Sequence, residues 1–182
     1  MTTYISILRG INVSGQRKIK MADLKEVYVS LGFQKVETYI QSGNVIFCCE
    51  QADEKKLVQK IELAIRTVFG FDVPVQVLEL SKLKKVYAGN PFVNDRHKDI
   101  SVLHVTFLAH EPDSDLLKRI ETDPKSADEF IVAGTVIYLF CPNGYGRTKL
   151  TNTFFETKLK IRATTRNWKT VTKLVELASA TA

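Results

Sequence analysis

The chain has 182 residues, of which 45% are hydrophobic and 25% charged, as is ordinary for a globular protein with a sizeable core. No apolar run approaches the roughly 20 residues of a membrane span. The start, Met1-Thr2-Thr3-Tyr4, lacks the basic and apolar pattern of a secretory signal peptide. These features exclude a membrane-spanning function, and we expect a cytoplasmic protein.

The formal charge of +6 is unevenly distributed along the chain. Residues 1–80 hold 10 Lys and Arg against 9 Asp and Glu, whereas residues 141–173 hold eight cations against a single carboxylate, Glu156. A concentrated basic segment predicts an anionic partner such as nucleic acid, a nucleotide or an acidic surface. The alternative is a set of lysines on solvated helix faces, which requires no partner.

The first part of the chain alternates between strand and helix patterns. Leu24, Val27, Tyr28 and Leu31 have the spacing of one helix face. The resulting order of elements, βαββαβ, is the signature of a ferredoxin-like sheet, for which we expect the strand order 4-1-3-2. Strands are predicted near residues 3–9, 36–40, 45–49 and 74–80, with a second helix, capped by Asp53, before the last of them.

The rest of the chain resembles a second copy with a different ending. The sequence therefore predicts an α+β protein with two ferredoxin-like (βαββαβ-type) subdomains in tandem, residues 1–80 and 81–182, and mainly antiparallel sheets. Two C-terminal helices are expected in the second subdomain. The elements predicted there are a helix capped by Ser81, a strand over 100–108, a helix from Asp113 or Ser114, strands over 129–133 and 136–140, a helix with Thr153 and Glu156 as its capping box, and a helix capped by Asn167.

Two polar loops are predicted to lie at the same end of the first sheet. They follow the first and second strands, which run in the same direction in a ferredoxin-like sheet, so residues 9–17 and 41–44 should be neighbours. A polar, glycine-containing loop between a strand and a helix is a common place for a binding site. The candidate ligand-binding residues here are Arg9, Asn12, Arg17, Lys18, Gln41, Ser42 and Asn44.

Each part of this loop cluster also has a simpler interpretation. Gly10 and Gly15 have the spacing of a phosphate-binding loop, but Gln16 and Arg17 replace the Lys and Ser/Thr that nucleotide hydrolysis requires. The first helix lacks a capping side chain and begins among cations. Either an anion binds there, or acidic side chains of the first turns balance the charge. The Ser-Gly-Asn stretch at residues 42–44 is also typical of an ordinary hairpin turn.

Three cations of the basic segment lie in predicted loops or helix starts: Arg147, Lys149 and Arg166. We expect them to contribute to anion binding, because arginine suits bidentate phosphate contacts and these positions are not on solvated helix faces. The alternatives are an ordinary loop at 142–149 and a simple helix start near Asn167, with Trp168 in the core.

Metal, cofactor and catalytic patterns are missing from the sequence. His97, His104 and His110 lack the spacing of zinc ligands. The cysteines, at positions 48, 49 and 141, fit small apolar residues in a reducing compartment. We therefore expect no metal and no cofactor. The third strand also fits the aromatic motif of an RNA-recognition domain poorly.

Three motifs resemble a bacterial family catalogued as domain of unknown function 1697. Its members open with LRGINVGG, carry TYxxSGNVxF and close with TxRNWxTVxKL. The corresponding stretches here are LRGINVSG at 8–15, TYIQSGNVIF at 38–47 and TRNWKTV at 165–171, with Ser14 in place of the usual glycine. The resemblance covers nearly the whole chain and implies two similar α+β halves, but no established activity.

Together these observations favour a cytoplasmic protein that binds a phosphorylated ligand or nucleic acid through its basic loops. One alternative is a small enzyme that acts on an anionic metabolite. Another is an interaction protein whose basic face meets an acidic partner. The sequence does not specify the oligomeric state.

Overall fold

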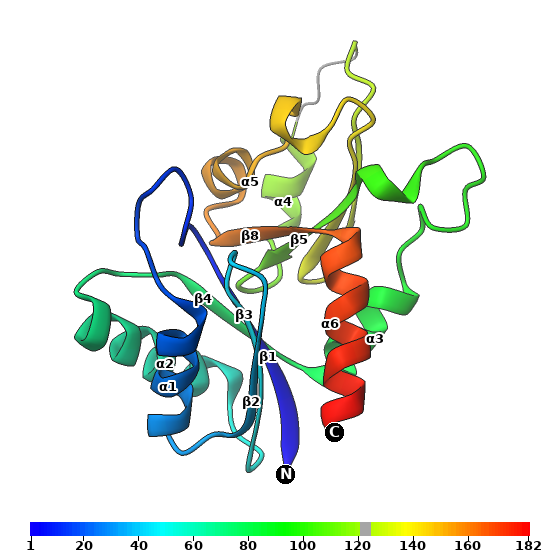
Figure 1. Cartoon of the computed structure of the whole chain (residues 1–182). Helices are drawn as coiled ribbons and strands as arrows, with labels where there is room; N and C mark the ends of the chain where they lie inside the picture. The colour runs from blue at the N-terminus through cyan, green and yellow to red at the C-terminus, as the bar shows by residue number, and fades with distance from the viewer. Residues whose placement is uncertain (121–124) are drawn as a thin grey trace. The chain divides into compact units, whose positions relative to one another are not determined.

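The computed structural model describes residues 1–120 and 125–182, which form an α+β protein with two four-stranded antiparallel sheets and six α-helices (Figure 1). The chain divides into two compact units. Unit 1 comprises Met1–Lys85 and Lys173–Ala182, and unit 2 comprises Val86–Thr172.

The sheet of unit 1 has the order β2-β3-β1-β4, with every neighbouring pair antiparallel. This is the order 4-1-3-2 expected from the sequence. In it β1 and β2 run in the same direction, because both pair antiparallel with β3. The elements are β1 (Thr2–Leu8), α1 (Met21–Ser30), β2 (Gln34–Tyr39), β3 (Asn44–Cys49), α2 (Glu54–Phe69) and β4 (Val75–Glu79).

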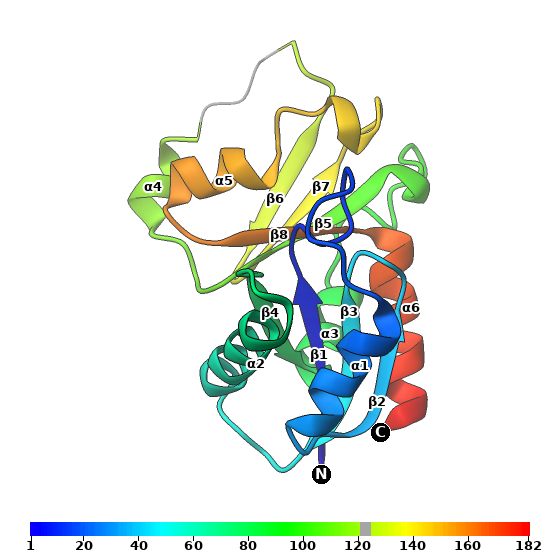
Figure 2. The same cartoon turned by 60° about the vertical axis from the view of Figure 1, so that its left-hand side comes forward.

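Helices α1 and α2 cover one face of this sheet (Figures 1 and 2). Their apolar stripes, which include Leu24 and Ile61, pack against sheet residues such as Phe47 in one buried cluster. The Asp53 side chain caps α2 by accepting hydrogen bonds from two backbone N–H groups. Helix α1 has Lys20 at its N-cap and no side-chain capping bond, as the sequence predicts.

The sheet of unit 2 has the order β6-β7-β5-β8 and is again antiparallel throughout. Helices α4 and α5 lie over one face of it (Figure 2), where Phe155 and Leu159 of α5 pack against Leu139 of β7. The elements of this part of the chain are α3 (Leu80–Ala88), β5 (Leu103–Leu108), α4 (Ser114–Lys118), β6 (Glu129–Ala133), β7 (Val136–Phe140), α5 (Asn152–Leu159), β8 (Ala163–Asn167) and α6 (Trp168–Thr181).

Strand β8 corrects the prediction for the end of the chain. Residues 164–168 were expected to form only a helix start, but Ala163–Asn167 pairs with β5 as the fourth strand of the sheet. Its Ala-Thr-Thr-Arg-Asn sequence is polar and short, so its strand conformation depends on the partner strand. Arg166 is consequently a strand residue and not a helix-start cation, while Asn167 caps α6 as expected, by accepting a bond from Thr170 N–H at 2.7 Å.

Three smaller predictions were also wrong. The cap of α5 is Thr151, whose hydroxyl accepts a bond from Phe154 N–H at 3.2 Å, and Thr153 lies inside the helix. Helix α3 begins at Leu80, so Ser81 does not precede it as a cap. Residues 100–102 form a 3-10 turn, and the strand starts only at Leu103.

Two helices carry the chain from one unit to the other. Helix α3 starts in unit 1 and ends in unit 2, whereas α6 starts in unit 2 and ends in unit 1. Within unit 1, the Lys35 Nζ of β2 donates to the Thr181 carbonyl of α6 at 2.8 Å. Within the described residues, no helix has both the length and the apolar character needed to cross a membrane.

Candidate functional site

The loop after β1 carries a small exposed hairpin at residues 12–17. Gln16 N–H donates to the Val13 carbonyl at 3.0 Å. Between them, Ser14 and Gly15 have φ angles of 50° and 74°, the pair of positive values that characterises a type I′ turn. The hairpin therefore has a defined backbone conformation although its side chains are exposed.

Asn12 fixes this hairpin to its surroundings. Its Nδ2 donates to the Ile19 carbonyl at 2.9 Å and to the Gln41 carbonyl at 3.0 Å, while its Oδ1 accepts from Ile19 N–H at 2.8 Å. The bond to Gln41 joins the loop after β1 to the turn after β2. The predicted proximity of these two loops is thus confirmed, and the Asn12 side chain joins them.

Gly43 allows the turn after β2 to approach the β1 loop closely. It has a φ angle of 79°, and a Cβ atom at this position would lie 2.6 Å from Ile11 Cδ1 and 2.9 Å from Leu8 Cβ. Its carbonyl accepts a bond from Leu8 N–H at 2.8 Å. The glycine is required by its packing as well as by its backbone conformation.

Asn44 is buried at the start of β3. Its Nδ2 donates to the Tyr39 carbonyl at 3.0 Å and to Ser42 Oγ at 3.3 Å. These bonds close the turn and give Asn44 and Ser42 a structural role there.

The cations of unit 1 occupy different positions in the loop. Arg9 is half-buried and its backbone N–H donates to the Pro74 carbonyl at 2.9 Å. Arg17 is exposed, and its Nη1 lies 3.3 Å from the place where a Cβ on Gly10 would be, so its side chain folds back over the loop. Lys18 is exposed beside it. For all seven candidate residues in unit 1, ligand binding stays a prediction.

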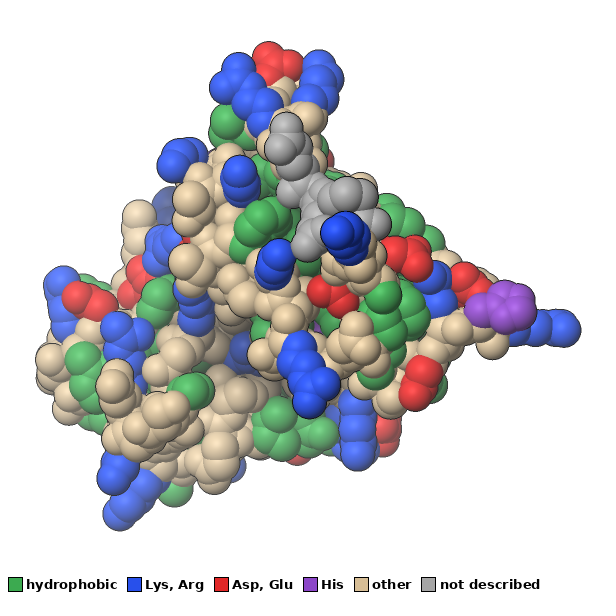
Figure 3. Space-filling view, turned by 90° about the horizontal axis from the view of Figure 1, so that it is seen from above, with side chains coloured by type: hydrophobic (Ala, Val, Ile, Leu, Met, Phe, Trp, Pro, Cys, Tyr) green, Lys and Arg blue, Asp and Glu red, His purple; other side chains and the backbone are tan. Residues whose placement is uncertain are grey.

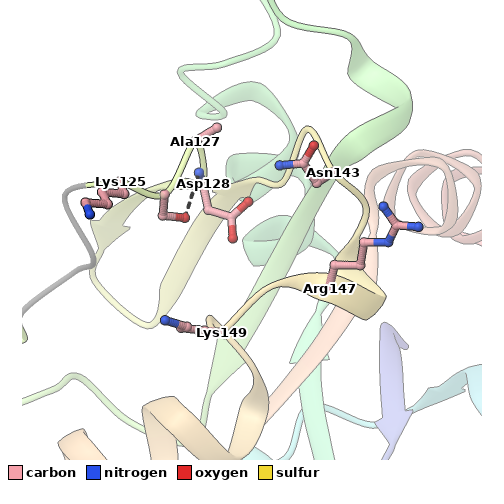
Figure 4. Close-up of a pocket in the computed structure, with 7 residues that line it drawn as sticks. Lys125, Ala127, Asp128, Asn143, Arg147 and Lys149 are labelled. Carbon is pink, nitrogen blue, oxygen red and sulfur yellow. Dashed lines mark hydrogen bonds between the residues drawn. The ribbon is translucent and has the colours of Figure 1, made fainter.

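Unit 2 contains a pocket of ≈ 390 Å³ between two loops. Lys125, Arg147 and Lys149 supply three positive charges to its described lining, and Asp128 supplies one negative charge. Figure 4 shows these side chains spread around the Asp128 carboxylate, with Lys125 and Lys149 on its left and Arg147 on its right. The other lining residues are Ser126, Ala127 and Asn143.

Strand register explains why these loops meet. Glu129 of β6 pairs with Phe140 of β7, so the residues just before β6 and just after β7 lie at the same end of the sheet. Thr148 then connects the loops directly, because its hydroxyl donates to Asp128 Oδ2 at 2.6 Å. The Thr148 hydroxyl oxygen in turn accepts a bond from Leu150 N–H at 3.0 Å. The pocket is therefore a built feature of the fold.

Aromatic stacking supports the loop that follows β7 and carries Arg147. The Tyr145 ring stacks on His104 of β5, with centroids 4.8 Å apart and an interplanar angle of 25°. Burial lowers the pKa of His104, although its hydrogen bond to the Val102 carbonyl acts in the opposite direction. A neutral imidazole that packs against Tyr145 has a structural role at this position.

Two of the three cysteines, Cys48 and Cys141, are buried. Burial raises the pKa of the Cys141 thiol to about 11, with a smaller opposing effect from its hydrogen bond to Thr148. Cys48 is buried, and burial also raises the pKa of the half-exposed Cys49. Among the described residues, no group of three or more His, Cys, Asp or Glu side chains is placed to hold a metal ion.

Arg166 lies outside the lining of this pocket. Its guanidinium is buried, and Nη1 donates to the Thr165 carbonyl at 3.1 Å. Burial lowers its pKa to about 10, so the side chain remains protonated at neutral pH. The Arg166 side chain thus bonds the backbone of its own strand, β8. Its ligand-binding role stays a prediction.

The model of a known family matches residues 1–138, and its description is "Protein of unknown function (DUF1697)". The chain belongs to this family. One solved relative is described as a conserved bacterial protein from Streptococcus pneumoniae; it is 25% identical, with a TM-score of 0.73 over 97% of this chain and 98% of that chain. No curated protein matches the chain.

For this DUF1697 member, two of the predicted site residues, Arg147 and Lys149, lie together in the unit 2 pocket. Sequence analysis missed Lys125, Asp128 and Asn143. A signal was available, because the β6–β7 hairpin was predicted correctly and its register brings the flanking residues together. From that register, the basic loop after β7 could have been predicted to lie beside the residues that precede β6.

The described lining of the pocket carries more positive than negative charge. Its three cations exceed its one carboxylate, and all three are exposed enough to reach a bound molecule. Figure 3 shows a face on which Lys and Arg side chains predominate over Asp and Glu. A surface lined by charges of one sign raises the local concentration of ions of the opposite sign.

Proposed function

We propose that this protein binds a phosphate-bearing small molecule in the unit 2 pocket. The observation that carries the proposal is the meeting of Lys125, Arg147 and Lys149 around one cavity of ≈ 390 Å³. Hydrogen bonds from cationic side chains to phosphate oxygens are short and strong, and arginine can donate two in parallel.

The pocket is also held in place before any ligand arrives. The Thr148–Asp128 bond joins its two loops, and the Tyr145–His104 stack supports the loop that carries Arg147. A site that is ordered in advance loses less conformational entropy on binding. This supports specific binding over loose attraction of counterions.

A small molecule fits this cavity better than a polymer does. The volume lies within the range of about 300–1,000 Å³ that is usual for small-molecule sites and is bounded by two loops. Nucleic acid is the second candidate, supported by the eight cations against one carboxylate in residues 141–173. Nucleic acid binding would weaken steeply with salt and strengthen with polymer length.

The remaining predictions are part of this proposal. We interpret both units as ferredoxin-like and as the products of a duplication, which the matching strand orders support. The loop between β1 and α1, with Arg9, Arg17 and Lys18, is proposed to contact anions as well. The protein is proposed to act in the cytoplasm.

The proposal is tested by titrating the full chain with inorganic phosphate at constant ionic strength, followed by NMR of backbone amides. Shifts should concentrate in residues 125–128 and 143–149. Replacing Arg147 or Lys149 by Ala should weaken binding about 10- to 150-fold, because each change removes one charge-assisted hydrogen bond worth about 1.5–3 kcal/mol.

Lys158→Ala is the matched control. Lys158 is an exposed cation of α5 in the same basic segment, but it does not line the pocket. Its replacement changes the net charge equally and should leave binding unchanged. If all three variants bind phosphate as the parent chain does, or if all three weaken equally, the pocket is not the site.

A further inference from the structure

The pocket contains a carboxylate that a site for a simple anion would not need. Asp128 lies among three cations, yet its own negative charge opposes the binding of phosphate. Its side chain is half-buried and points into the space between the labelled residues in Figure 4. Its presence therefore carries information about the rest of the ligand.

Hydrogen bonding fixes the direction of this carboxylate. Thr148 donates to Oδ2 at 2.6 Å, and the backbone N–H of Asp128 donates to Ser126 Oγ at 3.1 Å. An ionised carboxylate has about four acceptor positions. One of them receives the Thr148 proton, so the side chain retains acceptor capacity toward the cavity that it lines.

A carboxylate that can accept hydrogen bonds, placed beside three cations, suits a ligand that has both hydrogen-bond donors and negative charge. We infer that the ligand carries hydroxyl groups that donate to Asp128 in addition to a phosphate that the cations bind, as in a sugar phosphate. The inference rests on the proposed function and adds the chemistry of the non-phosphate part. The cavity of ≈ 390 Å³ leaves room for that part.

Asn143 is consistent with such a ligand. It is exposed, lines the same pocket and offers both a donor and an acceptor on its amide. Figure 4 places it on the opposite side of Asp128 from Lys149. The hydroxyl groups of such a ligand would donate to Asp128 and Asn143 while its phosphate is bound by the three cations.

The test compares ribose 5-phosphate with inorganic phosphate on the full chain, by calorimetry or NMR titration, for the parent and for Asp128→Asn. Asparagine keeps an oxygen that can accept the Thr148 bond, but it removes the charge and presents an amide donor. The parent should bind ribose 5-phosphate at least 10-fold more tightly than phosphate. The variant should lose most of that preference while binding phosphate as well as before or better.

Asp115→Asn is the matched control, because Asp115 is an exposed residue of α4 that pairs with Lys118 and lies outside the pocket. It changes the net charge equally and should preserve the preference. Circular dichroism verifies that both variants are folded.

The outcomes distinguish this inference from the proposed function. A parent chain that binds phosphate in the pocket without preferring ribose 5-phosphate, or an Asp128→Asn variant that keeps the preference, overturns the inference alone. If Asp128→Asn does not fold, replacing Thr148 by Val releases the carboxylate instead and should reduce the preference. A parent chain that binds neither probe in the pocket overturns both.

Discussion

Replacing Gly43 by Ala should test whether close packing between the two loops of unit 1 requires a glycine. A methyl group there would lie 2.6 Å from Ile11 Cδ1 and 2.9 Å from Leu8 Cβ. The Ile11 methyl is the end of a flexible side chain and can move. Leu8 Cβ is attached directly to the backbone of β1, so that contact requires a shift of the strand or the turn.

Two effects contribute to the expected loss of stability. A non-glycine residue at φ near 79° costs about 1–2 kcal/mol, and the overpacking costs about 1–3 kcal/mol. The free energy of unfolding of unit 1 should therefore fall by about 2–5 kcal/mol. Urea unfolding, followed by circular dichroism and by amide exchange of β1 and β3, measures this change.

Gly70→Ala separates the two effects. Gly70 ends α2 in the same unit, also with φ of 79°, but a Cβ there has no neighbouring atom within 4 Å. It carries the backbone strain without the clash, so Gly43→Ala should cost at least 1 kcal/mol more. Equal losses for the two variants would refute the packing argument.

Three further predictions concern single side chains. Asn12→Ala should cost about 2 kcal/mol and speed amide exchange of the bonded Ile19 N–H, because it removes three hydrogen bonds; unchanged exchange would contradict this. The Lys98 Nζ lies 4.1 Å from the Phe140 ring centroid, and the Lys98 side chain is only 12% exposed. Lys98→Ala should therefore lower the free energy of unfolding by about 1–3 kcal/mol in thermal or urea unfolding, and a change below about 0.5 kcal/mol would contradict a stabilising cation–π contact. Burial raises the pKa of Cys141 from its ordinary value of 9.0 to about 11, so the thiol of the unfolded chain loses its proton first as pH rises. The free energy of unfolding should therefore fall between about pH 9 and pH 11. Cys141→Ala should show a shallower fall, and an identical slope would refute the contribution of this thiol.

The local pattern of the sequence was sufficient for most of the fold. Helical spacing of apolar residues located α1 and α2, and the strands of both hairpins were predicted close to their observed bounds. The antiparallel order of the first sheet then predicted that the loops at residues 9–17 and 41–44 would be neighbours, as the Asn12–Gln41 hydrogen bond confirms. These features depend on short-range periodicity and on the few ways in which such elements pack.

Other features were decided only by tertiary structure. The polar β8 segment is a strand because β5 offers it backbone partners, as in the pairing of Thr106 with Thr165, and local propensity does not encode that partner. The pocket likewise depends on the bond between Asp128 and Thr148, 20 residues apart in the chain. Local sequence patterns located most of the helices and strands, though not β8, and also located the basic loops. Only long-range pairing decided which of those loops meet, because contact between distant residues follows from strand register and side-chain packing, which short sequence windows do not contain.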